Sequence, residues 1–383
     1  MATRTVVHIL NGEIFAGVDR TQLNLCRFVD PLRYHLHIIT LLDGFTADRA
    51  QEMGYTVDVL RMKSRLDLNV VRTIREILQD TNASLMQAHT IRGHLVGALA
   101  AHKLHVPVLA HIHSPAIHES ERTIKNLWNA FLEARLQRRT DCYMVVADSL
   151  KAHLIQKGIP LNKIITLLNA VDVMGLIETS QGMEPSVYQR LGLDDETKLI
   201  GMAATFRHRK GAQDLLQAVK ILGEQVIPYR LVMIGGGEKL AGGGNYLDVL
   251  KQMTVQLGID HQVIFVGYQE KPQQWMAALD MLVLPSRFGE GLPLVVLEAM
   301  ALGIPVIATP VEGTAEVLID QVTGLLPPAE DPEALAKSIK TLLFDPKKGR
   351  TMARKAKEVV LQRFDAREYA QRLMEIYDEV LKN

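Results

Sequence analysis

Two glutamates in one short stretch carry the clearest chemical signal in the sequence. Glu290 lies in a loop between two glycines, and Glu298 lies further along in a run that is otherwise almost entirely apolar. A run of this kind forms a buried helix, in which an unpaired carboxylate is costly. We therefore expect Glu298 to have a partner, either a protein donor or a ligand hydroxyl.

Between the two acids the chain offers backbone hydrogen-bond donors. We predict a helix that begins at Pro293, since proline is common at the first helical position, and that ends at Gly303. The first amides of a helix have no partner within it and lie at the positive end of its dipole. Together with the amide of Gly291 they suit a ligand whose hydroxyls flank phosphate groups.

A strand, a loop, the helix and a second strand must position these groups. Leu282–Leu284 and Val306–Ala308 are short apolar runs of the kind that form buried parallel strands. In an open parallel sheet, ligands bind beyond the carboxyl ends of the strands. The sequence therefore predicts a ligand site just after Leu284.

The stretch from Glu290 to Thr309 resembles the signature of the family-4 retaining glycosyltransferases. The similarity lies in the spacing of the two glutamates together with Gly-Leu-Pro after the first and Ala-Met-Ala after the second. It implies the GT-B fold, an α/β architecture of two Rossmann-like domains with parallel sheets facing each other across a cleft. From the residues alone, the alternative is an ordinary buried helix with one satisfied glutamate.

The resemblance covers essentially the whole chain, whose 383 residues are enough for two full cores. Strands and helices alternate in both halves, as in parallel sheets. We predict an N-terminal acceptor domain over residues 1–172 and a C-terminal sugar-nucleotide domain over 173–363. A last helix, at about 364–383, is expected to pack back on the N-terminal domain.

Composition excludes several classes of protein. With 48% hydrophobic and 22% charged residues the chain is globular, and its formal net charge of zero argues against nucleic acid as a partner. Two cysteines give no disulfide framework and fit a reducing compartment. No signal peptide or membrane-spanning run is evident. We therefore expect a cytoplasmic protein.

Residues 121–139 predict a basic amphipathic helix with Trp128 and Phe131 in its apolar stripe. Such a helix can lie on an anionic membrane, at the inner membrane face. The alternative, which we favour, is that the stripe packs on the sheet. The membrane interpretation would suit an enzyme that glycosylates lipid-linked acceptors.

A basic loop follows the strand predicted at Lys198–Ala203. Lys210 and Gly211 match a Lys-Gly pair of the family, whereas Thr205 stands where the family has arginine. The resemblance implies two cations that neutralise the leaving nucleoside diphosphate. We assign these roles to Lys210 and Arg207; the alternative is a solvated basic loop.

The resemblance also assigns roles to individual residues. It implies that Glu298 binds the ribose hydroxyls, that Glu290 holds sugar hydroxyls, and that His113 contacts the donor sugar near its reactive carbon. A lone histidine at a strand end otherwise usually packs, and we interpret His89 in that way. Histidines do not occur at zinc spacings. The remaining candidates are the donor-side Gly17, Tyr268, Gly291, Leu292, Pro293 and Leu294, and the acceptor-side Glu13 and Phe15.

The implied mechanism is metal-independent and uses no cofactor beyond the sugar nucleotide, for which we favour UDP over GDP. No Asp-x-Asp triplet occurs, and the departing phosphate is expected to act as base, with Glu290 as nucleophile the less favoured alternative. The acceptor is a carbohydrate, a lipid-linked glycan or a small molecule. Two rivals are a sugar-nucleotide epimerase and a catalytically silent partner subunit, the latter suggested by Thr205 and Ala170. An NAD oxidoreductase is disfavoured because Leu240 interrupts the glycine fingerprint.

Overall fold

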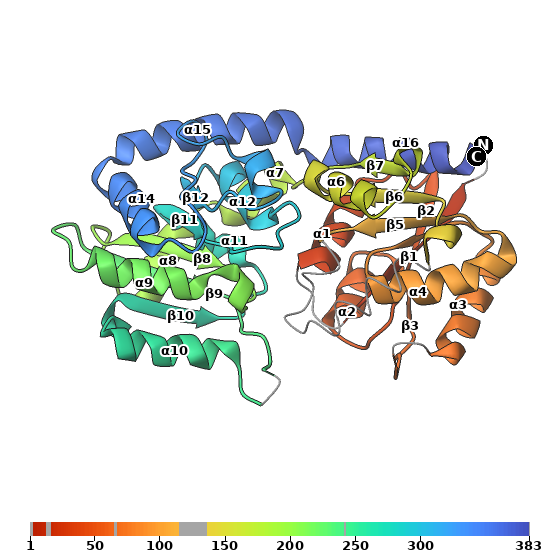
Figure 1. Ribbon diagram of the computed structural model, residues 1–383, viewed down its shortest axis with the longest axis horizontal. Helices are drawn as coiled ribbons and strands as arrows, with labels where there is room; N and C mark the ends of the chain where they lie inside the picture. Colours follow the sequence, from red (N-terminus) through yellow and green to blue (C-terminus); the bar gives the residue numbers. More distant parts are fainter. Residues whose placement is uncertain (1–2, 13–16, 65–66, 115–135, 241–242, 383) are drawn as a thin grey trace. The chain divides into compact units, whose positions relative to one another are not determined.

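The computed structural model describes residues 3–12, 17–64, 67–114, 136–240 and 243–382. The chain divides into two compact units, one formed by Met1–Ala170 with Ala366–Asn383 and the other by Val171–Asp365 (Figure 1). The division after Ala170 lies close to the predicted one after residue 172. None of the helices in the described ranges is both long enough and apolar enough to span a bilayer.

The first unit is built on a parallel sheet of seven strands in the order β3-β2-β1-β4-β5-β6-β7. The order reverses between β1 and β4, which is the topological switch point where α/β proteins of this type bind ligands. The strands are β1 Arg4–Leu10, β2 Tyr34–Thr40, β3 Thr56–Val59, β4 Ala83–Ala88, β5 Val108–Ile112, β6 Cys142–Val145 and β7 Ile164–Thr166.

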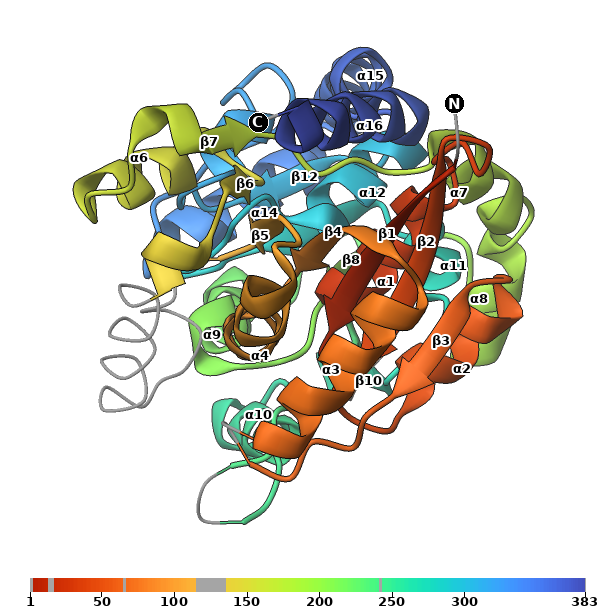
Figure 2. The same cartoon turned by 90° about the vertical axis from the view of Figure 1, so that its right-hand side faces the viewer.

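Helices cover both faces of this sheet (Figure 2). Alternate residues of β1 show why, since Val6 packs into one core cluster and Val7 into another on the opposite face. Helices α3 and α4 cover the face of Val7, and α16 covers the face of Val6. The described helices are α1 Gly17–Cys26, α2 Phe45–Glu52, α3 Leu68–Asp80, α4 Ile91–Ala101, α6 Asp148–Gln156 and α16 Ala366–Lys382.

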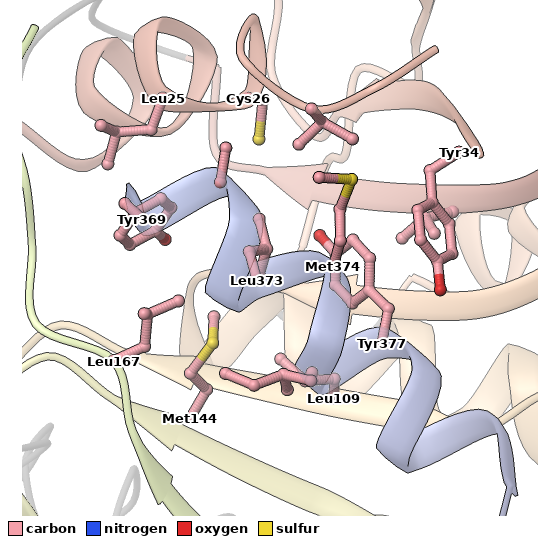
Figure 3. Packing of buried hydrophobic residues seen from close by; sticks show 14 of the residues in the cluster. Leu25, Cys26, Tyr34, Leu109, Met144, Leu167, Tyr369, Leu373, Met374 and Tyr377 are labelled. Atoms are coloured by element: carbon pink, nitrogen blue, oxygen red, sulfur yellow. The ribbon is translucent and has the colours of Figure 1, made fainter. Parts of the chain in front are cut away.

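Helix α16 supplies a large part of the core on its face of the sheet. Tyr369, Leu373 and Tyr377 are buried against side chains of α1 and of several strands, among them Leu25 and Leu109 (Figure 3). Burying side chains of this size stabilises by roughly 1.5–3 kcal/mol each. The last helix of the chain is therefore an integral part of the first unit.

The second unit has a parallel sheet of five strands in the order β10-β9-β8-β11-β12. Its strands are β8 Lys198–Ala203, β9 Tyr229–Ile234, β10 Val263–Gly267, β11 Met281–Leu284 and β12 Val306–Ala308. Its helices are α7 Val173–Ser180, α8 Glu184–Leu191, α9 Ala212–Leu222, α10 Tyr246–Leu257, α11 Pro272–Met276, α12 Leu294–Leu302, α13 Thr314–Val317, α14 Pro332–Phe344 and α15 Pro346–Arg363.

One local prediction fails. Pro293 precedes α12 and does not begin it, since its ψ of 108° is extended rather than helical. Helix α6 begins at Asp148, whose side chain accepts a hydrogen bond from Thr166 Oγ1 at 2.8 Å. Near Leu325 the chain forms an isolated bridge to Ile307.

Candidate active site

Both signature glutamates are buried in the second unit. Glu290, in the loop after β11, is 5% exposed, and Glu298, in the middle of α12, is 8% exposed. The predicted buried helix is confirmed, and it ends as expected at Gly303, whose φ of 75° is the left-handed conformation that glycine adopts readily. The N-cap residue of α12, Pro293, forms no side-chain hydrogen bond to the first turn, and the amides at the start of a helix have the electropositive character that attracts anions.

Glu290 is held by a lysine and a serine. Lys210 Nζ donates to Glu290 Oε1 at 2.5 Å, and Ser286 Oγ donates to the same oxygen at 2.6 Å. Arg209 Nη1 lies 3.9 Å from it. Within the described part of the chain, no hydrogen bond is formed to the second carboxylate oxygen, Oε2. That oxygen is the one available to a ligand hydroxyl.

Charge balance at this site favours a bound anion. Burial raises the pKa of Glu290, but Lys210 and Arg209 lower it more, so the carboxylate is ionised at neutral pH. Burial lowers the pKa of Lys210; Glu290 opposes that shift, and the charges of Arg209 and Arg207 add to it. Two cations, Lys210 and Arg209, thus lie beside one buried carboxylate, and a phosphate would offset the remaining positive charge.

The loop after β8 and the loop after β11 are in direct contact, and this contact positions Lys210 and Glu290. Gly211 has a φ of +68°, and a Cβ on it would lie 1.8 Å from the carbonyl oxygen of Pro285. Only glycine allows the loop after β8 to approach the loop after β11 so closely. The backbone amide of Arg287 donates to Arg209 O at 2.8 Å, and Arg209 Nη1 donates to Gly289 O at 2.6 Å.

Arg287 anchors the same pair of loops through its side chain. Its Nε and Nη2 donate to the two oxygens of Asp214 at 2.7 and 2.6 Å, and its Nη1 lies 2.7 Å from His208 Nε2. A bidentate pair of this kind fixes orientation as well as distance. Sequence reasoning missed the Arg287–Asp214 pair because only the fold brings together residues 73 positions apart. It also missed Ser286, although that residue lies only four positions before Glu290.

Arg207, the predicted second phosphate cation, lies beside Glu238. Its Nε lies 3.8 Å from Glu238 Oε2, too far for a hydrogen bond, whereas Arg209 is the arginine that adjoins Glu290. The glycine-rich loop after β9 meets this segment, since Phe206 N donates to Gly236 O at 2.8 Å. Tyr268, just after β10, is 53% exposed at the same edge of the sheet.

The first unit places His113 directly after β5 and Gly17 at the exposed start of α1, with a φ of +52°. Close packing against a neighbouring backbone segment requires a glycine at Gly12 and not at Gly17. A Cβ on Gly12 would lie 2.5 Å from Leu42 O, whereas a Cβ on Gly17 would meet nothing within 4 Å. Glu13 and Phe15, and residues 121–135 of the predicted basic helix, lie outside the described residues.

Histidines gather at the carboxyl ends of β4 and β5. His89, His111 and His113 each have a ring nitrogen within 4.8 Å of those of the other two, a grouping that a metal ion could use. The sequence did not predict this cluster, because the residues belong to neighbouring parallel strands and follow no metal-binding spacing. His89 is 3% exposed, which agrees with its interpretation as a packing residue.

Comparison with known proteins gives the family. Residues 185–359 match the model of glycosyl transferases group 1, and residues 15–174 match that of glycosyltransferase family 4. The chain belongs to these glycosyltransferases. The predicted family is thereby confirmed, and the matched ranges lie almost entirely within the second and first units respectively.

Individual glycosyltransferases resemble the chain over most of its length. It is 27% identical to the N-acetyl-α-D-glucosaminyl L-malate synthase of Bacillus anthracis, over 83% of this chain and 80% of that protein. HepE from Anabaena, crystallised with UDP and glucose, superposes with a TM-score of 0.86 at 22% identity, covering 98% of this chain and all of that one. Sucrose-phosphate synthase from Thermosynechococcus elongatus has a TM-score of 0.83 at 20% identity, covering 99% of each. These structural likenesses confirm the GT-B fold.

Proposed function

We propose that this glycosyltransferase moves a sugar from a nucleoside diphosphate sugar to a hydroxyl acceptor, with retention of anomeric configuration and without a metal ion. The observation that carries the proposal is Glu290, buried and ionised against Lys210 at the carboxyl end of β11. This geometry presents a carboxylate for sugar hydroxyls beside cations for a diphosphate. Glu298, buried eight positions further on in α12, is the partner for the ribose hydroxyls.

The diphosphate is assigned to the amides of Gly291, Leu292 and Leu294 and to the cations Lys210 and Arg207. Pro293 has no amide hydrogen and serves to set the start of α12. As the glycosidic bond breaks, negative charge grows on the departing phosphate, and donors that are already oriented stabilise it without reorganising. These groups replace the divalent ion that other transferases use, which supports metal independence.

Retention is proposed to follow from attack on the same face as the leaving group. The acceptor oxygen forms the new bond to the anomeric carbon while the phosphate departs, and the acceptor proton passes to a phosphate oxygen. Glu290 is hydrogen-bonded to both Lys210 and Ser286. Two donors stabilise the carboxylate and weaken it as a nucleophile, which favours the role of holding sugar hydroxyls.

UDP is the proposed nucleotide. HepE, whose fold this chain shares, was crystallised with UDP and with UDP-glucose. Tyr268 and the adjoining backbone after β10 are assigned to the base, and Gly17 to the diphosphate from the first unit. A sugar, a lipid-linked glycan or a small molecule is the proposed acceptor class; one relative is a D-inositol 3-phosphate glycosyltransferase, at 32% identity over 51% of this chain. The acceptor-side assignment of Glu13 and Phe15 remains a prediction.

Calorimetric titration of UDP, GDP and ADP in the presence of EDTA tests the donor site. We expect UDP to bind, and Glu298→Ala to weaken it by about ten-fold or more, the equivalent of a hydrogen bond to a charged group. Glu333→Ala, on the exposed first turn of α14, is the matched control and should bind as the wild type does. Tighter binding of GDP would overturn the donor assignment, and a requirement for metal would overturn metal independence.

Turnover separates the remaining alternatives. Release of UDP that depends on an added acceptor, with a product of the donor's anomeric configuration, is the expected result. Inversion would contradict the proposed mechanism. Conversion of the sugar nucleotide without any acceptor would identify an epimerase, and binding without turnover would identify a silent partner subunit.

A cytoplasmic location is proposed with these substrates, and a peripheral membrane contact through residues 121–139 is the related hypothesis. Pelleting with anionic liposomes tests it. Binding that salt removes would support the contact, whereas no binding would leave the alternative in which the apolar stripe packs on the protein.

A further inference from the structure

A row of buried polar side chains crosses the centre of the first sheet, on the face that α16 covers. His8 lies in β1 and is paired in register with Gln87 of β4. His111 lies in β5, and Tyr377 approaches from α16. These four side chains, and His89 after β4, are each at most 3% exposed. Such a row in a core is costly unless its members bond to one another.

The members are linked end to end. These five residues and His113 form one continuous line of contacts that ends at His113. In order, it joins His111 Nδ1 to Gln87 Nε2 (3.3 Å), Gln87 Oε1 to Tyr377 Oη (2.6 Å), Tyr377 Oη to His8 Nε2 (3.1 Å), His8 Nδ1 to His89 Nε2 (3.0 Å) and His89 Nδ1 to His113 Nε2 (3.3 Å).

All four imidazoles of this row are neutral at pH 7. Burial lowers the pKa of His8 and of His113 to about 3, and it lowers the pKa values of His89 and His111 well below the ordinary value. A neutral imidazole carries one N–H and one lone pair. The direction of one hydrogen bond therefore dictates the direction of the next.

The bond between Tyr377 and Gln87 sets that direction. At 2.6 Å it lies within the range of O–H···O bonds and is shorter than N–H···O bonds usually are. The hydroxyl of Tyr377 is thus the donor, and the amide oxygen of Gln87 is the acceptor. Because the hydroxyl proton of Tyr377 is directed at Gln87, the Tyr377 oxygen can only accept a hydrogen bond from His8 Nε2–H.

The same reasoning passes along the row to its end. His8 Nδ1 accepts from His89 Nε2–H, and His89 Nδ1 accepts from His113 Nε2–H. We propose that this buried row is a positioning device that holds His113 in its Nε2–H tautomer, so that its Nδ1 is a hydrogen-bond acceptor. Tyr377 and His8 are then positioning residues that act on His113 from the core.

This tautomer selects a class of ligand group. An imidazole nitrogen with a lone pair accepts from a hydroxyl, and it repels a carbonyl or phosphate oxygen that brings no proton. His113 would therefore recognise a sugar hydroxyl of the donor, a conclusion that rests on the proposed function for its catalytic meaning. The tautomer itself is a property of the row and does not depend on that function.

The direction of the row also bears on metal binding by the histidine cluster. In this arrangement Nε2 of both His111 and His113 carries a proton, and His89 Nδ1 already accepts a hydrogen bond from His113. No described residue accepts from His111 Nε2. A metal held by all three rings would have to displace protons and reverse the row, so the geometry favours hydroxyl recognition here.

Nitrogen-15 NMR of histidine-labelled, full-length protein tests the inference without any variant in the row. Proton coupling distinguishes a protonated ring nitrogen from an unprotonated one in each neutral histidine. We expect the signals of His113, identified by their loss in His113→Gln, to show a proton on Nε2 only. A proton on Nδ1, or an averaged mixture, would overturn the inference. If that variant does not fold, the row still predicts that none of its four histidines carries a proton on Nδ1.

Tyr377→Phe removes the hydroxyl that sets the direction while keeping the ring in the core. Tyr34→Phe is the matched control, because Tyr34 lies in the same cluster, 5.1 Å from the Tyr377 ring, but donates its hydroxyl to Asp378 (Figure 3). We expect Tyr377→Phe to give a mixture of His113 tautomers and to lower kcat by about ten-fold, the equivalent of one hydrogen bond. Tyr34→Phe should change neither. Equal tautomer populations in both variants would overturn the inference.

The two proposals fail separately. If the NMR result is as expected but His113→Gln has normal turnover, the proposed role of His113 at the sugar is wrong, and the row remains a tautomer-setting device. If His113→Gln abolishes turnover but the wild-type ring carries its proton on Nδ1, the positioning inference is wrong, and the glycosyltransferase assignment is unaffected.

Discussion

The two units bury polar groups in opposite ways. In the second unit, Glu290 stays ionised in the interior because Lys210 and Arg209 lie beside it. In the first unit, burial keeps four histidines neutral, and hydrogen bonds join them to one another, to Tyr377 and to Gln87. In a charge pair the ions themselves fix the hydrogen-bond direction, because an ammonium or guanidinium group only donates and a carboxylate only accepts. A neutral row needs a consistent direction along its whole length.

Breaking the charge pair should give the largest effect. Lys210→Met leaves Glu290 buried without its cation, which we expect to destabilise the second unit by about 3–5 kcal/mol and to reduce turnover by roughly a thousand-fold. Urea unfolding and initial rates measure the two losses. The double variant Lys210→Met/Glu290→Gln should recover most of the stability and none of the activity. Recovery of activity would contradict the electrostatic role of Lys210.

A smaller loss of stability and turnover is expected when Arg287, which links the two loops around the Glu290–Lys210 pair, is replaced. Arg287→Lys keeps the charge but cannot form the bidentate bond to Asp214, so we expect about 1–3 kcal/mol of destabilisation and about a ten-fold lower kcat. Lys239→Arg in the loop after β9 is a conservative control that should be neutral. An unchanged kcat would mean that Glu290 and Lys210 do not depend on this anchor.

Acidification should distinguish the units. His8 and His113 have folded pKa values of about 3 against 6.5 when unfolded, so the unfolded state takes up protons first and stability falls as the pH drops below about 6.5. Between pH 6.5 and 5, each of these two histidines lowers the free energy of unfolding by about 2 kcal/mol. Glu290 has a lowered pKa, so its contribution is lost only below its usual value of 4.5. At pH 5, amide hydrogen exchange should be accelerated more in the first unit than in the second. The reverse order would contradict the neutral row.

The smallest effect is expected from restoring an arginine to the basic loop. Thr205→Arg reproduces the family pattern, but Arg207, Arg209 and Lys210 already crowd this region. We expect the affinity for UDP to change by no more than about three-fold, since another exposed charge is worth under 1 kcal/mol. Calorimetry measures it. A much larger gain would mean that the native cations do not reach the diphosphate.

Where the sequence predicted well, local pattern was enough. The strands β8 and β12 have the bounds that the sequence predicted. The assignments of Glu290 and Glu298 also rest on local spacing and neighbours, and their roles stay predictions. The predicted Lys210 also lies beside Glu290, because Gly211 allows the two loops to touch.

What the sequence could not show depends on strand order. His8, Gln87 and His111 are far apart along the chain, and they meet only because β1, β4 and β5 are neighbours in the sheet. Tyr377 joins them from the last helix. The position of Arg209 beside Glu290 could not be predicted either, because side-chain direction in an irregular loop follows no regular period. The role of Arg207 stays a prediction.

Helix α16 has a consequence for how the protein is made. The second unit is continuous in sequence and is complete once Asp365 has been synthesised, whereas the first unit needs residues 366–383 to close its core. In a nascent chain the first unit therefore stays incomplete, with the α16 face of its sheet uncovered, until residues 366–383 have been synthesised. Domains that form early on the ribosome usually lie first along the chain. Here the carboxyl-terminal unit is able to fold first.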